Sequence, residues 1–170
     1  KYATPNFNGL SGDLIWSADP TAAAENMAVA AVGGAKNTAW NANVRYANGP
    51  LNAFYSYFRN NNVANVDGAD QNSDRIGVAY KLPMGLKFGV VYDRSKRETA
   101  AATTNDRRAW SIPISYTTGP HGIYFSYAKA GDDNDVADTG AKNVVLGYTY
   151  SLSKRTQLGA AWSRISNDSA

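Results

Sequence analysis

In this 170-residue chain, apolar and aromatic side chains recur at every second position in one segment after another. The clearest example is residues 108–117, where one face would carry Trp110, Ile112, Ile114 and Tyr116, with serine or proline between them. A period of two is that of a β-strand whose two faces differ chemically. An aromatic residue at each end of the apolar face is typical of a strand with lipid outside and water inside. The pattern therefore predicts a transmembrane β-strand.

The composition excludes a membrane protein built of helices but not one built of strands. The mean hydropathy is −0.42, and no stretch approaches the ~18 consecutive apolar residues that a transmembrane helix needs. Barrel strands are half polar, so their hydropathy is ordinary. The chain has no cysteine, which excludes disulfides and thiolate metal sites. Its net charge of +3 is not gathered into a basic run, so no nucleic-acid partner is expected.

Nine segments follow this alternation, and a short tail at residues 1–3 precedes them. Their outward apolar positions lie within 10–16, 40–46, 51–57, 76–82, 86–92, 110–116, 123–127, 144–150 and 158–162. Short connections rich in Gly and Pro occupy 5–9, 48–50, 83–85, 119–122 and 151–155. Longer polar stretches lie at about 19–36, 60–73, 95–108 and 130–141. This layout predicts an all-β, antiparallel up-and-down transmembrane β-barrel, in which residues 1–170 form one segment with short periplasmic turns and long extracellular loops.

The aromatic residues are sorted along the strands by type. The loop ends would carry Trp16, Trp40, Trp110 and Trp162. The turn ends would carry Tyr46, Tyr80, Tyr116 and Tyr150. The spacing between the rows, roughly 20 Å along a strand, suits the ~25 Å apolar band of an outer-membrane barrel once the strands tilt. A soluble β-sandwich would bury the same residues but has no reason to sort them, so we interpret these eight residues as a membrane-interface girdle.

The opposite faces carry polar and charged residues that we expect to line a pore. They are Arg45, Arg75, Lys81, Lys87, Asp13, Asp93, Asn41 and Asn43. Basic residues outnumber acidic ones, and fixed positive charge in a confined lumen concentrates anions, which predicts anion preference. The alternative is that these side chains simply meet water near the turn ends, because selectivity is decided at a constriction.

Three positions fit the pattern poorly. Phe54 and Phe58 share the face assigned to the lumen, which should be wet. Pro113 lies in the middle of a strand, where it cannot donate a hydrogen bond to its neighbour. We expect a bulge or a local break there.

No catalytic, cofactor or metal site is expected. The only histidine, His121, lies in a Gly-Pro-His-Gly turn without a neighbouring Ser or paired carboxylate, so we expect a solvated turn residue. The acidic loops 67–70 and 132–135 could bind Ca²⁺ through carboxylate oxygens. However, the first lacks the ligand spacing of a calcium loop and the second is a plain charge cluster, so solvated loops are expected.

Two stretches carry a resemblance to a known family. Residues 2–12 (YATPNFNGLSG) resemble the segment that follows the constriction loop in general porins of Gram-negative bacteria. Residues 148–156 and 162–167 are similar to the penultimate hairpin of that family. The resemblance implies a 16-stranded homotrimeric barrel in the outer membrane, in contact with its lipid and lipopolysaccharide, in which loop three folds inward to narrow the pore.

The chain departs from the full pattern of that family. It lacks the early strands, the constriction loop and a last strand ending in the customary Phe, and Gly159-Ala160-Ala161 replaces a segment usually richer in aromatic residues. The resemblance therefore implies a fragment, with trimer contacts on strands outside the chain.

The function expected from these observations is passive diffusion of small hydrophilic solutes and ions, with a preference for anions. A substrate-selective porin is the first alternative, and its aromatic track would be Phe54, Phe58 and Tyr124. A second alternative is a non-pore barrel for adhesion or anchoring, whose lumen would be plugged by side chains. Small inward residues such as Gly77 and Ala79 argue against plugging. A soluble β-sandwich binding module is the remote third.

Overall fold

The structure, a computed structural model, describes most of the chain. The described residues are 1–18, 36–63, 66–99, 102–134 and 136–168. The expected loop at 19–36 lies outside these ranges apart from its last residue. Within them, no helix has the length and apolar character needed to cross a membrane.

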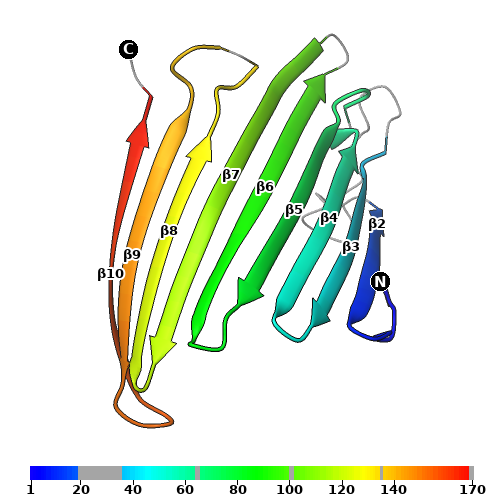
Figure 1. Ribbon diagram of the computed structural model, residues 1–170. Helices are drawn as coiled ribbons and strands as arrows, with labels where there is room; N and C mark the ends of the chain where they lie inside the picture. Colours follow the sequence, from blue (N-terminus) through cyan, green and yellow to red (C-terminus); the bar gives the residue numbers. More distant parts are fainter. Residues whose placement is uncertain (19–35, 64–65, 100–101, 135, 169–170) are drawn as a thin grey trace.

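In the described part of the chain, ten strands form one antiparallel sheet, in which each strand pairs with its neighbours in the chain (Figure 1). They are β1 (Tyr2–Ala3), β2 (Leu10–Ala18), β3 (Thr38–Asn48), β4 (Leu51–Asn61), β5 (Gln71–Lys81), β6 (Leu86–Thr99), β7 (Ala102–Thr118), β8 (His121–Ala130), β9 (Ala141–Ser151) and β10 (Gln157–Asn167). The prediction of an all-β up-and-down sheet is confirmed. The expected tail forms the two-residue β1, which pairs with β2.

Two tight turns depend on glycine because they press against the next hairpin. Gly9 and Gly85 have φ values of 93° and 87°. A Cβ atom at Gly9 would overlap the carbonyl of Ala47, and one at Gly85 would overlap that of Thr117. The glycines let the Ala47 and Thr117 amides donate to the Gly9 and Gly85 carbonyls at 2.8 and 3.1 Å. These bonds tie each turn to the adjacent strand.

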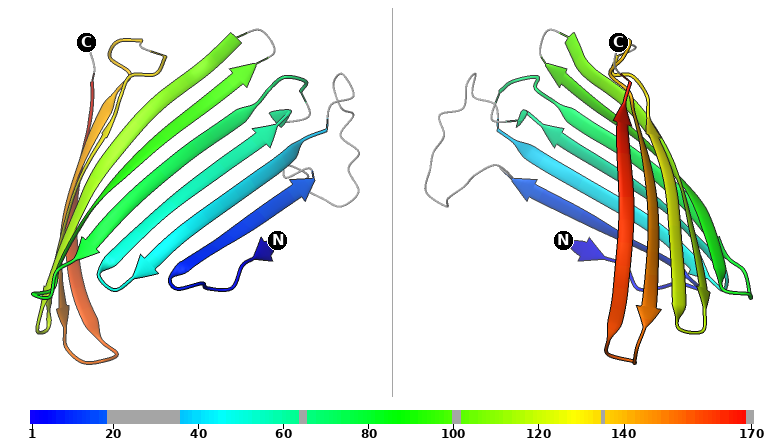
Figure 2. Two further views of the ribbon diagram at one scale, coloured as in Figure 1. Left: turned by 45° about the vertical axis from the view of Figure 1, so that its right-hand side comes forward. Right: turned by 90° about the vertical axis from the view of Figure 1, so that its left-hand side faces the viewer.

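The sheet is a single curled layer with two free edges. Figure 2 shows the curl and places β1 and β10 at opposite margins, and no ladder joins these two strands. The apolar residues of one face are uncovered, as at Trp16 and Leu146, which are 52% and 51% exposed. Among the described residues, Ala39 is the one buried hydrophobic side chain. A soluble sandwich would cover this face with a second layer, and the described strands provide none.

Pro113 interrupts the sheet on one side only. The ladder between β7 and β8 runs through Pro113 opposite Ser126 without a shift. The ladder between β6 and β7 has pairs at Phe88/Ile114 and Val91/Ser111 but none at the two positions between them, and its register is unchanged. The expected local break is therefore present toward β6, since a proline lacks one donor on one side. The expected bulge is not at Pro113, and the register shift of this ladder lies at Arg97/Glu98 instead.

Phe54 lies on the expected face, in a position that depends on a glycine. Its cross-strand partner on β5 is Gly77, and a Cβ atom there would overlap the edge of the Phe54 ring. The ring therefore lies along the sheet, over the place where another residue would have a side chain. Such cover of a strand glycine by an aromatic ring stabilises the cross-strand pair.

Replacing Gly77 tests this arrangement. Gly77→Ala should lower the free energy of unfolding by on the order of 1 kcal/mol, because the new methyl group occupies the space of the Phe54 ring. Thermal unfolding in detergent, followed by circular dichroism, measures the change. Gly147→Ala is the matched control, because Gly147 also faces an aromatic residue, Tyr124, but its Cβ would approach no atom closer than 3.6 Å. Equal effects of the two substitutions would contradict the account.

Candidate functional site

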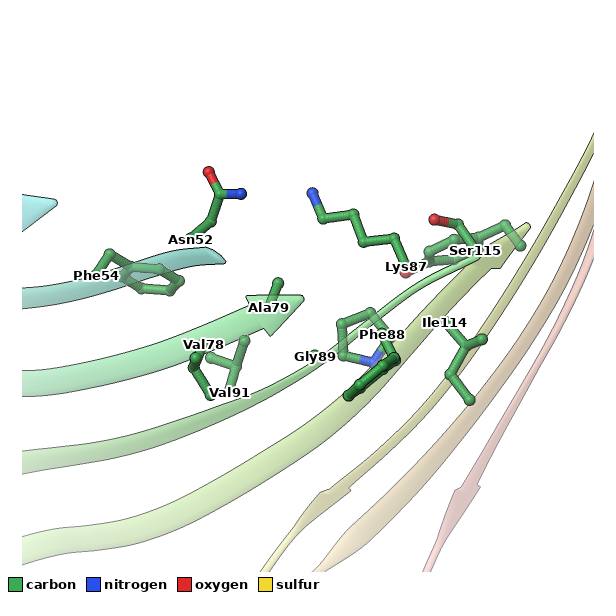
Figure 3. Close-up of a pocket in the computed structure, with 12 residues that line it drawn as sticks. Asn52, Phe54, Val78, Ala79, Lys87, Phe88, Gly89, Val91, Ile114 and Ser115 are labelled. Atoms are coloured by element: carbon green, nitrogen blue, oxygen red, sulfur yellow. The ribbon is translucent and has the colours of Figure 1, made fainter. Parts of the chain in front are cut away.

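The two faces of the curled sheet differ in chemistry. In Figure 3, Asn52, Lys87 and Ser115 project to one side of the sheet, and Phe88 and Ile114 project to the other. The strands curl toward the side of Lys87, so this polar face is concave. The apolar face is convex and presents its side chains outward.

The eight residues expected to line a pore all lie on the concave face. Cross-strand partners share a face, and the ladder pairs Asp13 with Asn43, Arg75 with Asp93, and Lys81 with Lys87. Arg45 and Asn41 lie two residues from Asn43 on β3, and therefore on the same side. The strand register thus places all eight residues on the same face of the sheet.

Ion pairing neutralises part of the charge on the concave face. The Nε atom of Arg75 donates to a carboxylate oxygen of Asp93 at 2.8 Å. Asp13 accepts a hydrogen bond from the amide of Asn43 at 2.9 Å. In the part of the chain that is described, Arg45, Lys81 and Lys87 form no ion pair. Their three positive charges face the concave space uncompensated.

Two further basic residues lie on the concave face and were missed by the sequence analysis. Arg97 pairs across the sheet with Gln71, and Arg107 pairs with Ser95. Arg107 also donates to the carbonyl oxygen of Thr139 at 3.1 Å. They were missed because 95–108 was interpreted as a loop, whereas β6 and β7, which are 14 and 17 residues long, extend through most of it. The described residues of this stretch are mostly polar or charged on both faces, so it lacks the apolar signal of a strand.

On the convex face, the expected tyrosine row crosses the sheet with a regular offset. The ladder leads from Tyr46 across two strands to Val78, and Tyr80 lies two residues nearer the turns. The same offset of two residues over two strands recurs between Tyr80 and Tyr116 and between Tyr116 and Tyr150. The successive members of the row are Tyr46, Tyr80, Tyr116 and Tyr150.

The tryptophan row has the same slope. The ladder leads from Trp40 across four strands to Asp106, and Trp110 lies four residues nearer the turns. Trp16 and Trp40 lie directly opposite each other, and Trp162 lies four residues nearer the turns than the position reached from Trp110 across three strands. On average, both rows therefore shift by one residue per strand. With a rise of ~3.3 Å per residue and strands ~4.8 Å apart, this shift corresponds to strands inclined by roughly 35° to the normal of the rows. That inclination is the tilt of strands in membrane barrels.

Basic residues lie next to the tryptophan row, on its side toward the loops. We define the basic row as Arg108, Lys129, Lys142 and Arg164, one residue from each of β7, β8, β9 and β10. Arg108 lies two residues beyond Trp110, and Lys129 pairs with Trp110 across the ladder. Lys142 forms an ion pair with Asp168 at 3.4 Å. No ion pair involves the other three within the described ranges.

The neighbouring charges on β6 and β7 are paired. On the loop side of the tryptophan row, Arg94 donates to both carboxylate oxygens of Asp106, at 3.0 and 2.7 Å. The Nζ atom of Lys96 lies 3.8 Å from one of these oxygens. The hydrogen bonds from Arg94 hold the pKa of Asp106 below its ordinary value of 3.8. This bidentate pair joins the extended ends of the two longest strands.

Comparison with known proteins decides the family. The chain matches the Gram-negative porin family over residues 1–170. The chain belongs to the Gram-negative porins. Proteins of this family lie in the outer membrane, and their fold is that of a channel rather than of an enzyme.

A solved structure shares the fold of this porin. It is an anion-selective porin from Comamonas acidovorans, with a TM-score of 0.78 and 21% sequence identity. The match covers 98% of this chain and 48% of that chain, so the chain spans about half the length of the porin it resembles. No curated protein matches the chain significantly.

In the porin sheet, His121 joins the tyrosine row. Its Nδ1 atom lies 2.7 Å from the hydroxyl oxygen of Tyr148. Its ring centroid is 5.1 Å from that of Tyr150 and 6.0 Å from that of Tyr148. The residue is exposed, as expected, but the register adds contacts that its position in the turn did not indicate. Its place on the convex face follows from its alternation with Ile123 and Phe125.

The described acidic residues of the 132–135 loop hold the loop together and connect it to β7. Asp132 accepts hydrogen bonds from the backbone amides of Thr139 and Gly140, and Asp133 accepts one from the amide of Asp106 at 3.1 Å. Asp135 lies outside the described residues. Among the residues that are described, no three or more His, Cys, Asp or Glu side chains form a group that could hold a metal ion.

Proposed function

We propose that this porin forms part of the wall of a water-filled channel through which small hydrophilic solutes and ions diffuse passively, with a preference for anions. The observation that carries the proposal is the single-layer sheet with two opposite faces. Its convex face is apolar and bounded by two parallel aromatic rows, and its concave face is polar. A wall with lipid on one side and water on the other needs this arrangement.

The two free edges require partners in the membrane. Each unpaired backbone group in hydrocarbon costs roughly several kcal/mol, because the peptide group loses its hydrogen bonds to water. An open sheet edge is therefore not stable there. We propose that further strands pair with β1 and β10 and close the barrel. The chain matches only 48% of the length of the Comamonas acidovorans porin, which supports the presence of further strands.

The charges of the concave face support anion preference. Arg45, Lys81 and Lys87 face the lumen without acidic partners among the described residues, whereas Asp93 is neutralised by Arg75. Fixed charges within a Debye length of ~8–10 Å raise the local concentration of counterions. Small residues on this face, among them Gly89, leave the lumen open, which disfavours a plugged barrel for adhesion or anchoring. No catalytic role is proposed for His121, because its partners are tyrosines of the convex face.

We also propose lipopolysaccharide as the lipid partner of the basic row. The basic row lies just outside the tryptophan row, at the level where phosphate groups of an outer leaflet would lie. Three of its four residues have no described acidic partner and can therefore pair with phosphate. Homotrimeric assembly is proposed from the family resemblance, and the mass of the detergent-solubilised full-length protein measures it.

Ion selectivity tests the channel function. In a planar bilayer with a salt gradient, the full-length protein should conduct and give a reversal potential that corresponds to anion preference. Arg45→Gln should lower the chloride-to-potassium permeability ratio roughly twofold, because it removes an unpaired luminal charge. Arg155→Gln, in the turn between β9 and β10, is the matched control and should leave the ratio unchanged. Cation preference of the unsubstituted protein would contradict the proposal.

Binding of lipid A tests the lipid partner. The double substitution Arg108→Gln/Lys129→Gln should weaken lipid A binding by about 1 kcal/mol per removed charge. Arg155→Gln/Lys154→Gln removes the same two residue types at the turn end and should have little effect. Native mass spectrometry of the detergent-solubilised protein measures both. Equal weakening by the two pairs would exclude a specific role of the basic row.

A further inference from the structure

A hollow lies on the concave face of the sheet, in its turn-side half. Its volume is about 330 Å³, and its walls include Phe54 of β4 and Tyr124 of β8. Gly89 and Pro113 lie between these rings, where the pairing of β6 and β7 is interrupted. The hollow exists because two small or ring-closed residues lie between two aromatic ones. Its size is at the lower end of the ~300–1,000 Å³ range of small-molecule sites.

Polar groups converge over one part of the hollow. In Figure 3 the Lys87 side chain extends from β6 toward β4, and the Asn52 amide extends toward it from β4. Ala79 lies between them on β5. An ammonium group and an amide NH₂ both donate hydrogen bonds, and together they match the two oxygens of a carboxylate.

The charge of Lys87 has no described acidic partner. Its cross-strand neighbours are Lys81 on β5 and Ser115 on β7. Two like charges directly opposite each other are destabilising. A bound anion would relieve this repulsion.

We propose that this hollow is a binding subsite for a small amphipathic carboxylate, of the class of aromatic and short branched monocarboxylates. Its carboxylate pairs with Lys87 and Asn52, and its hydrocarbon part lies on Ala79, Gly89 and Pro113, between the rings of Phe54 and Tyr124. A hydrated inorganic anion gains nothing from this apolar floor, whereas a hydrocarbon group loses its contact with water there. The proposal rests on the proposed channel function and gives the channel a preferred solute class, which supports the substrate-selective alternative.

A binding measurement tests the subsite separately from conduction. Saturation-transfer NMR on the detergent-solubilised full-length protein, titrated with benzoate and with acetate, gives both affinities. Benzoate should bind at least several-fold more tightly than acetate, because only benzoate has a ring to place on the apolar floor. Lys87→Gln should weaken benzoate binding about tenfold, because a charge-assisted bond is lost. Lys154→Gln, which removes a lysine from an exposed turn, is the matched control and should bind as the unsubstituted protein does.

A second variant tests the apolar part alone. Ala79→Ile fills the hollow without changing any charge, and a β-branched residue suits a strand. It should weaken benzoate binding severalfold and acetate binding less, because acetate has no ring that needs the filled space. Equal affinities for the two anions, or unchanged benzoate binding in Ala79→Ile, would overturn the proposal.

Conduction of the same protein in planar bilayers separates this inference from the channel function. Benzoate should reduce the chloride current of the unsubstituted protein at lower concentrations than acetate does. A protein that conducts but does not distinguish benzoate from acetate overturns the subsite alone. A protein that binds benzoate in the hollow but does not conduct overturns the channel function and, with it, the role of the hollow as a solute subsite.

Discussion

The register of the β-ladders is the interaction on which the other features depend. A slip of one residue between two strands would exchange the faces of one of them and place charged side chains among the outward apolar ones. The pairs Trp16/Trp40 and Asp13/Asn43 show both faces aligned within a single hairpin. Tight turns such as the one at Gly9 hold this alignment, because their backbone bonds to the neighbouring strand leave no room for a slip.

The register also converts a sequence pattern into an orientation in the membrane. Aromatic residues at fixed heights along tilted strands must shift along the ladder from one strand to the next. The steps from Tyr46 to Tyr80 and from Trp40 to Trp110 have this shift, with one residue per strand in both rows. Two rows of equal slope define two parallel planes, and the apolar band lies between them. A buried soluble core has no comparable constraint.

Much of this architecture could be predicted from the sequence, because alternation and turn residues are local signals. The strand around Trp110 and the placement of Arg75 and Asp93 on inward faces follow from a period of two, whereas their direct pairing comes from the register. The extensions of β6 and β7 could not be predicted, because their residues are mostly polar or charged on both faces and give no apolar signal at every second position. The hollow beside Lys87 could not be predicted either, because residues from several strands form it and only the register brings them together.

The most direct test measures the environment of successive residues on β9. Single cysteines are placed at positions 143–149 of an otherwise cysteine-free full-length protein and spin-labelled in liposomes; residues 1–170 contain no cysteine that must be replaced. Collisions with oxygen should be frequent at Val144, Leu146 and Tyr148, which face lipid. Collisions with a water-soluble nickel complex should be frequent at the positions between them. Equal accessibility at all seven positions, or the opposite alternation, would contradict the assignment of the two faces.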